Sequence, residues 1–178
     1  AAPLDMRMDR TQGQTLGQML SDVTPESLAD VIFKYGEERH SRRIARAVVE
    51  ACRSASVTTT TELATIVRRA VYRRGRARID PATRTFQALR IWVNQELDGL
   101  DLFLRSAACR LKGGARLAVI SFHSLEDRIV KYTLRELDRG GEFAFRVLTR
   151  KPVRPGQDEI RRNPRARSAK LRVVERSL

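Results

Sequence analysis

The sequence of 178 residues is long enough to bury one sizeable hydrophobic core, or one core together with a small helical lobe. Its 35 Lys and Arg residues outnumber its 21 Asp and Glu residues, which gives a formal net charge of +14. This excess indicates a polyanionic partner, with nucleic acid ahead of an anionic membrane surface, and a basic surface without a special partner is the alternative.

The first part of the chain carries only helical patterns. Residues 1–22 hold few periodic apolar positions and are expected to form a loop that leads into a short helix. Thr24, which precedes a proline, is typical of a helix N-cap, and Gly36 suits the C-terminal cap of that helix. Residues 37–53 repeat apolar side chains at helical spacing and predict a second helix with one packed face.

That second helix carries arginines at the same spacing on a different face, and few acidic residues lie where they would neutralise them. These arginines are Arg39, Arg42, Arg43 and Arg46. A solvated face is the ordinary interpretation, but the positive charge favours contact with phosphates. A capping box formed by Thr59 and Glu62 opens a further helix, and the basic loop over 73–78 could grip a nucleic-acid backbone. The sequence thus predicts a small helical lobe.

Strand patterns begin in the second half. Asp80 and the proline after it start a helix, and a second apolar stripe over 100–111 follows. The apolar run 117–122 is too short for a helix and predicts a strand buried on both faces, as in a parallel sheet. After the helix that follows it, 143–147 alternates as a strand and 170–175 closes the chain as another. A long basic loop is expected over 151–169, and the fold class is α/β.

Polar residues crowd the point where the run 117–122 ends and the next helix begins. They are Ser121, His123, Ser124, Glu126, Asp127 and Arg128. Ligands of open α/β sheets bind at such strand ends. Helix capping by Ser124 and dipole complementarity by Asp127 are the structural interpretations. We expect no metal site, because no further ligand has suitable spacing, and no serine hydrolase, because G-x-S-x-G is absent.

Neither cysteine suggests an oxidising compartment. Cys52 and Cys109 lie within helical patterns and have no C-x-x-C partner, so we expect no disulfide or zinc site. No signal peptide or long apolar span is present, which predicts a cytoplasmic protein without membrane contact. Because the chain begins without an initiator methionine at Ala1, we also expect an N-terminal part to precede it.

Six blocks of sequence, in order along nearly the whole chain, resemble one bacterial family. They are PLDMRMD at 3–9, YGEER at 35–39, RRIAR at 42–46, PATRTFQALR at 81–90, ISFHSLEDR at 120–128 and NPRARS at 163–168. The family is that of the small-subunit ribosomal RNA cytosine-N4 methyltransferases (RsmH or MraW). The resemblance implies N4-methylation of a cytidine in small-subunit ribosomal RNA, within the assembled small ribosomal subunit, with S-adenosyl-L-methionine as cofactor.

The resemblance also implies a domain organisation. The family resembles the Rossmann-like class I methyltransferases, with a helical domain inserted into the sheet domain. On that basis residues 1–9 are a linker from a missing N-terminal half, 10–80 are the helical insertion domain, and 81–178 are the C-terminal part of the Rossmann-like domain with its late strands. The family's cofactor motifs, among them D-L-G-V-S-S, are absent here, and we expect them upstream of Ala1.

Roles for single residues follow from the same resemblance. The pocket for the target amine is expected to include Asp5, with Ser121, His123 and Ser124 reaching it from the end of the strand. RNA contacts are expected from Arg39, Arg42, Arg43, Arg84, Arg90, Arg128, Asn163, Arg165, Arg167 and Lys170, positioning the RNA rather than specifying its sequence. His123 as the proton acceptor is one option, because the amine can also lose its proton to water.

Two other functions remain open at this point. One is a catalytically incomplete module that binds RNA or the ribosome. The other is a basic α/β enzyme that acts on a phosphorylated small molecule. The dependence of RNA affinity on salt separates the latter from RNA binding, because several phosphate contacts give a steep negative slope. The oligomeric state is not determined by the sequence.

Overall fold

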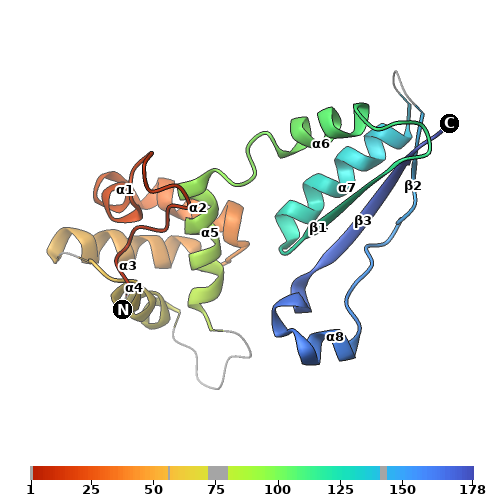
Figure 1. Cartoon of the computed structure of the whole chain (residues 1–178). Coiled ribbons are helices and arrows are strands. Elements are labelled where there is room, and N and C mark those ends of the chain that lie inside the picture. The colour runs from red at the N-terminus through yellow and green to blue at the C-terminus, as the bar shows by residue number, and fades with distance from the viewer. Residues whose placement is uncertain (1, 56, 72–79, 141–143) are drawn as a thin grey trace. The chain divides into compact units, whose positions relative to one another are not determined.

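The computed structural model describes residues 2–55, 57–71, 80–140 and 144–178, and it divides the chain into two compact units (Figure 1). Unit 1 comprises residues 1–96 and unit 2 comprises residues 97–178. Each unit has a hydrophobic core of its own. The basic loop predicted over 73–78 lies outside the described residues.

Unit 1 is helical. Its helices are α1 (Leu16–Asp22), α2 (Pro25–Gly36), α3 (Ser41–Ser54), α4 (Thr60–Ala70) and α5 (Ala82–Asn94). Their apolar faces meet in a core whose fully buried members include Leu28, Ile32, Ile44, Leu63 and Leu89. The segment that precedes α1 is part of this core, since Leu4 is buried and its carbonyl accepts a hydrogen bond from the backbone N–H of Gly17 at 2.8 Å. Leu4 thus ties this segment to the helical core, and the assignment of residues 1–9 as a linker between domains stays a prediction.

The predicted helix caps are largely confirmed. Thr24 caps α2, and the Thr59–Glu62 capping box opens α4. Gly36 has a different role from the one predicted, because α2 includes it and the left-handed cap residue is Glu37, with φ of 49°. A Cβ added to Gly36 would lie 2.6 Å from the backbone oxygen of Arg84 on α5. Glycine at position 36 thus lets two helices approach each other closely.

Unit 2 packs two helices on one face of a small sheet (Figure 1). Its elements are α6 (Leu100–Cys109), β1 (Arg116–Ser121), α7 (Ser124–Asp138), β2 (Phe145–Val147), α8 (Gln157–Arg162), a 3-10 helix (Pro164–Ser168) and β3 (Lys170–Arg176). The strand order is β1-β3-β2, and both pairings are antiparallel. Leu104 and Ala108 of α6 and Val130 and Leu134 of α7 join Val174 of β3 in its core.

The prediction that the run 117–122 is a strand buried on both faces is wrong. Leu117 and Val119 pack against the core, but Ile120 is 56 % exposed and Phe122, just after the strand, is 55 % exposed. The α7 and α6 helices cover only one face of the sheet, and among the described residues β1 pairs with β3 alone. The outer apolar side chains of β1 therefore lack a covering layer.

The segment expected to be a basic loop also differs from the sequence prediction. The basic loop expected over 151–169 contains the short helix α8 and the 3-10 helix. The two compact units divide after Glu96, because α5 packs against α2 of the helical unit, and the domain boundary expected after residue 80 stays a prediction. No described helix is long and apolar enough to cross a membrane.

Candidate functional site

The turn between β1 and α7 is fixed by reciprocal hydrogen bonds. His123 is the N-cap residue of α7, and its ring Nδ1 accepts from the backbone N–H of Glu126 at 3.2 Å. The Glu126 carboxylate accepts in turn from the backbone N–H of Phe122 at 2.9 Å. This arrangement is similar to a capping box, with histidine in the serine position and with the Glu126 carboxylate accepting from the residue before the N-cap. The cap predicted at Ser124 thus belongs to His123, and Ser124 is the first helical residue.

The cap restricts the chemistry that His123 can perform. A neutral imidazole that accepts at Nδ1 carries its proton on Nε2. Nε2 lies 3.9 Å from a Glu126 carboxylate oxygen. In this tautomer the only lone pair is on Nδ1, so the ring would have to give up the cap to accept a proton from a substrate. The geometry therefore suits a residue that shapes the turn better than one that removes a proton.

Asp127 anchors the same turn to β3 through a buried ion pair. Its carboxylate accepts from Arg172 Nε at 2.6 Å and from Arg172 Nη2 at 3.2 Å, and Lys170 Nζ lies 3.4 Å away. Burial opposes ionisation of Asp127, but hydrogen bonds and charge attraction from Arg172 and Lys170 outweigh it and lower the pKa of the carboxyl group. The ion pair of Asp127 with Arg172 therefore holds α7 against β3.

Ser121 is buried at the end of β1 and takes part in the same arrangement. Its hydroxyl donates to the backbone oxygen of Lys170 at 3.4 Å, across the β1–β3 ladder. The structure thus brings Ser121, His123 and Ser124 together within one turn, as the sequence predicted, and adds Arg172 as the residue that anchors it.

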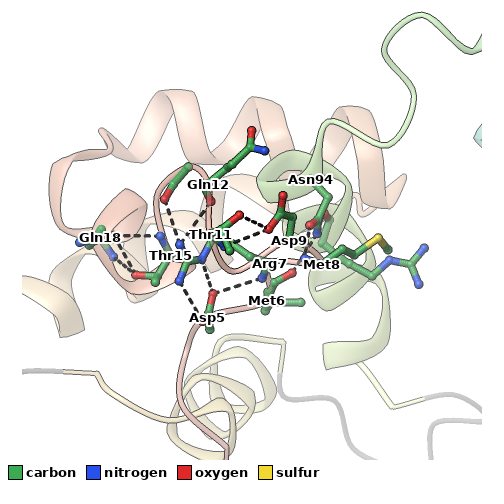
Figure 2. Close-up of polar contacts among 12 residues, drawn as sticks. Asp5, Met6, Arg7, Met8, Asp9, Thr11, Gln12, Thr15, Gln18 and Asn94 are labelled. Atoms are coloured by element: carbon green, nitrogen blue, oxygen red, sulfur yellow. Dashed lines mark hydrogen bonds and ion pairs between the residues drawn. The ribbon is translucent and has the colours of Figure 1, made fainter.

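Asp5 lies in unit 1, in a tightly hydrogen-bonded loop (Figure 2). Two nitrogens of Arg7 donate to the Asp5 carboxylate, Nε at 2.7 Å and Nη2 at 3.2 Å. The remaining Arg7 nitrogen donates to the backbone oxygens of Gln12 and Gly13. The side-chain hydrogen bond from Arg7 lowers the pKa of Asp5 below its usual value despite partial desolvation. Asp5 is consequently a fixed, ionised carboxylate that can only accept hydrogen bonds.

Asn94 of α5 clamps this loop (Figure 2). Its amide nitrogen donates to the backbone oxygen of Met6 at 2.9 Å, and its amide oxygen accepts from the backbone N–H of Met8 at 2.7 Å. Met6 has a positive φ of 61°, which residues other than glycine rarely adopt. The clamp therefore holds the Asp5 loop in a backbone conformation that the chain would not favour alone.

The predicted RNA-contacting residues of unit 1 fall into two groups. Arg39, Arg42 and Arg43 are exposed, and no other residue in the described part of the chain forms an ion pair with them. Arg84 and Arg90, both on α5, form hydrogen bonds within unit 1. The first donates to the backbone oxygen of Glu37 at 3.2 Å, and the second forms a bidentate pair with Glu96.

The predicted RNA-contacting residues of unit 2 also divide. Arg165 and Arg167 are exposed in the 3-10 helix, and Arg128 is exposed on α7. The side-chain oxygen of Asn163 caps the 3-10 helix by accepting from the backbone N–H of Arg165 at 3.2 Å. Lys170 is mostly buried beside Asp127. Asn163 and Lys170 thus have structural contacts besides any with RNA.

Three residues of these arrangements were not singled out in the sequence. Arg7 and Asn94 make contacts that no local sequence pattern indicates. Arg172 had a detectable signal, because in the strand 170–176 it occupies the same face as the buried Val174. A charged residue on the inward face of a strand requires a buried partner. Within the described residues no cluster of three or more His, Cys, Asp or Glu side chains could hold a metal ion.

Comparison with known proteins connects these arrangements to one family. The family model described as the MraW methylase family matches residues 1–177. A protein of Acidobacterium capsulatum named ribosomal RNA small subunit methyltransferase H is 53% identical over 174 residues, covering 98% of this chain and 57% of that protein. Proteins of the same name from Sorangium cellulosum and Neorickettsia sennetsu are 54% and 50% identical, with 54% and 57% of their lengths covered.

The chain thus spans about half the length of the curated relatives it matches. The match nevertheless extends over both units without interruption. It includes the Asp5 loop, the arginine-rich start of α3 and the β1–α7 turn. The chain belongs to the MraW methylase family.

Proposed function

We propose that this chain is the RNA-facing portion of an S-adenosyl-L-methionine-dependent methyltransferase that modifies N4 of a cytidine in small-subunit ribosomal RNA. The observation that carries the proposal is the family match over residues 1–177, together with relatives of about half identical sequence that are named for this substrate. The net charge of +14 and the exposed arginines of both units support an RNA partner. Such an enzyme would work in the cytoplasm, on the assembled small subunit.

The β1 strand supports the proposal that unit 2 is part of a larger, Rossmann-like sheet. In such folds the inner strands are paired on both sides and covered on both faces. Among the described residues β1 pairs only with β3, and its outer side chains Ala118 and Ile120 are exposed. We propose that further strands add to the free edge of β1, and that unit 1 is the inserted helical domain.

The residues of the β1–α7 turn do not by themselves fit the cofactor. The ribose of a nucleoside cofactor is usually held by an acidic side chain. Both carboxylates of this turn are occupied, Glu126 by the backbone N–H of Phe122 and Asp127 by Arg172. We therefore derive no step through the cofactor from this chain, and we propose that the sequence motifs that hold it belong to the portion of the relatives that this chain does not match.

The target amine defines what this chain would contribute. The N4 amine of cytosine is a weak nucleophile because its lone pair is delocalised into the ring, so it must be oriented and shielded from water. An ionised carboxylate that accepts its hydrogens does so, and Asp5 is kept ionised and oriented by Arg7. We propose that Ser121, His123 and Ser124 also belong to the amine pocket, with His123 shaping it rather than taking the proton.

A chimaera tests the proposal. The portion of the Sorangium cellulosum relative that this chain does not match, which we expect to be N-terminal, is fused to this chain; the matched part is 54% identical. The fusion is incubated with S-adenosylmethionine labelled in its methyl group and with small ribosomal subunits that lack the modification. We expect label in N4-methylcytidine after digestion to nucleosides. Label in another nucleoside, or none while the relative itself is active, would contradict the proposal.

Two controls accompany the chimaera. The chain alone should bind labelled S-adenosylmethionine weakly or not at all, and tight binding would overturn the assignment of the cofactor site to the unmatched portion. The Asp5→Asn variant of the chimaera loses the charge but keeps the shape of the side chain. We expect it to lower kcat with little effect on the KM for S-adenosylmethionine, because Asp5 is proposed to contact the target base alone.

A second candidate is an RNA- or ribosome-binding module without catalysis of its own. The observation that favours it is the coverage, since the chain spans about half of each relative. This module would bind the small subunit with the same salt dependence, but the chimaera would show no methyl transfer. The two candidates are therefore separated by the experiment above.

A further inference from the structure

The seam between α2 and α3 in unit 1 is hollowed at both ends. These two helices pack closely against each other. One hollow, of about 500 Å³, lies between the second half of α2 and the start of α3, with Phe33 on one side and Arg39, Arg42 and Arg43 on the other. A second hollow, of about 440 Å³, lies between Pro25 at the start of α2 and the second half of α3.

Arginines follow the seam from one hollow to the other. Arg46 and Arg53 line the second hollow and continue the series that begins at Arg39. All five arginines of the series are exposed, and none forms an ion pair with another described residue. Two acidic side chains also line the hollows, Asp30 and Glu50, so the seam keeps a net positive charge. Unpaired guanidinium groups in a row attract a chain of phosphates.

Phe33 sets this surface apart from a merely basic one. Its ring is 63 % exposed at the edge of the first hollow, beside the arginines. An exposed aromatic ring within a basic groove is the arrangement on which unpaired bases stack, whereas the base faces of a duplex are already covered. Asp30, in the same hollow, can accept a hydrogen bond from the exocyclic amine of a cytosine.

We infer that the α2–α3 seam binds a single-stranded segment of the RNA substrate, with one unpaired base stacked on Phe33 and the adjoining phosphates on the arginines of α3. The 14 residues of α3 span about 21 Å, which matches about six nucleotides at the 3.4 Å spacing of a stacked strand. This inference rests on the proposed function, because it assumes an RNA substrate. It adds Phe33, Arg46 and Arg53 to the RNA-contacting residues.

Binding of the full chain to a fluorescein-labelled ten-nucleotide single-stranded RNA, and to the same RNA in a duplex, tests the inference. We expect Phe33→Ala to weaken single-strand binding about fivefold or more, and Phe33→Tyr to stay within about twofold of the parent. The matched control is Phe103→Ala, because that ring is similarly exposed, at 67 %, but lies on α6 of the other unit. It should leave the affinity unchanged.

A spectroscopic variant and a salt titration add readouts that reduced stability would not mimic. In a Trp92→Phe background, which removes the single tryptophan, Phe33→Trp should be quenched on RNA binding and Phe103→Trp should not. Replacing Arg46 and Arg53 by Gln should reduce the slope of log affinity against log salt by about 0.7 for each phosphate that is no longer neutralised.

The outcomes distinguish this inference from the proposed function. If the parent binds RNA and Phe33→Ala behaves like Phe103→Ala, the seam is not the single-strand site, although RNA binding by the chain stands. Equal effects of Phe33→Ala on single-stranded and duplex RNA would also overturn the inference. If the parent binds neither RNA, the proposed function fails together with it.

Discussion

Removal of the Asp127 carboxylate should destabilise unit 2 strongly. In the Asp127→Ala variant Arg172 stays buried, with its side chain only 7 % exposed, and loses both hydrogen bonds to the carboxylate. Removing one partner of a buried ion pair costs about 3–5 kcal/mol, because the other charge is left uncompensated. We expect at least about 3 kcal/mol here, because Lys170, whose Nζ lies 3.4 Å from the carboxylate, loses its counter-charge as well.

Urea unfolding followed by circular dichroism measures this destabilisation, and amide hydrogen exchange places it in α7 and β3. Glu136→Ala is the matched control, because Glu136 lies on the same helix and pairs with Arg105 while both are largely exposed. An exposed pair contributes roughly 0–1 kcal/mol. If Asp127→Ala cost no more than Glu136→Ala, the anchoring role of the buried pair would be refuted. Asp127→Leu combined with Arg172→Met should recover much of the stability, since the buried guanidinium is removed together with its carboxylate partner.

The same residue predicts a pH dependence. The pKa of Asp127 is lowered in the folded chain from its ordinary value of 3.8, so its ionised form stabilises the fold above that pH. The stabilisation is lost as the pH falls through the lowered folded value. The difference in free energy of unfolding between the parent and Asp127→Ala should therefore be constant near neutral pH and shrink as the pH falls below the ordinary value of 3.8. A difference that grew on acidification would contradict this sign.

Three further substitutions test other contacts of unit 1 by urea unfolding. Gly36→Ala should cost about 2 kcal/mol despite the better helix propensity of alanine, because the new Cβ meets the Arg84 backbone oxygen at 2.6 Å, and a stabilised variant would contradict the close approach. Asn94→Ala should cost about 1–2 kcal/mol and speed amide exchange in the loop around Met6, whereas unchanged exchange would argue against the clamp. Thr59→Ala should cost about 1 kcal/mol because it removes the α4 cap, and Thr59→Ser should restore it.

Local signals in the sequence were sufficient for most elements of the fold. Helix starts at Thr24 and Thr59 were predicted correctly because N-caps depend on a few neighbouring residues. The apolar run at β1 also identified a strand correctly, but not its environment. Whether a strand is covered on both faces depends on other segments, and α6 and α7 cover only one face of this sheet.

The candidate site was predictable in composition and not in contacts. The crowding of Ser121, His123 and Ser124 follows from their proximity in the chain. The partner of Asp127 is Arg172, which lies 45 positions later, and no local pattern can specify such a pairing. The cap of α7 was assigned to serine because serine is a common cap, whereas the ring nitrogen of His123 takes that role in the structure.

The uncovered face of β1 has a consequence for how the chain behaves in solution. Within the described part of the chain β1 pairs with β3 alone, so its other edge, with exposed Ala118 and Ile120, is a template on which a second copy can add its own strand. The net charge of +14 opposes such encounters by mutual repulsion. Added salt shortens the range of this repulsion from about 10 Å at 0.1 M to about 3 Å at 1 M. We therefore expect the isolated chain to self-associate more as salt is raised, the opposite of the effect of salt on the proposed RNA binding.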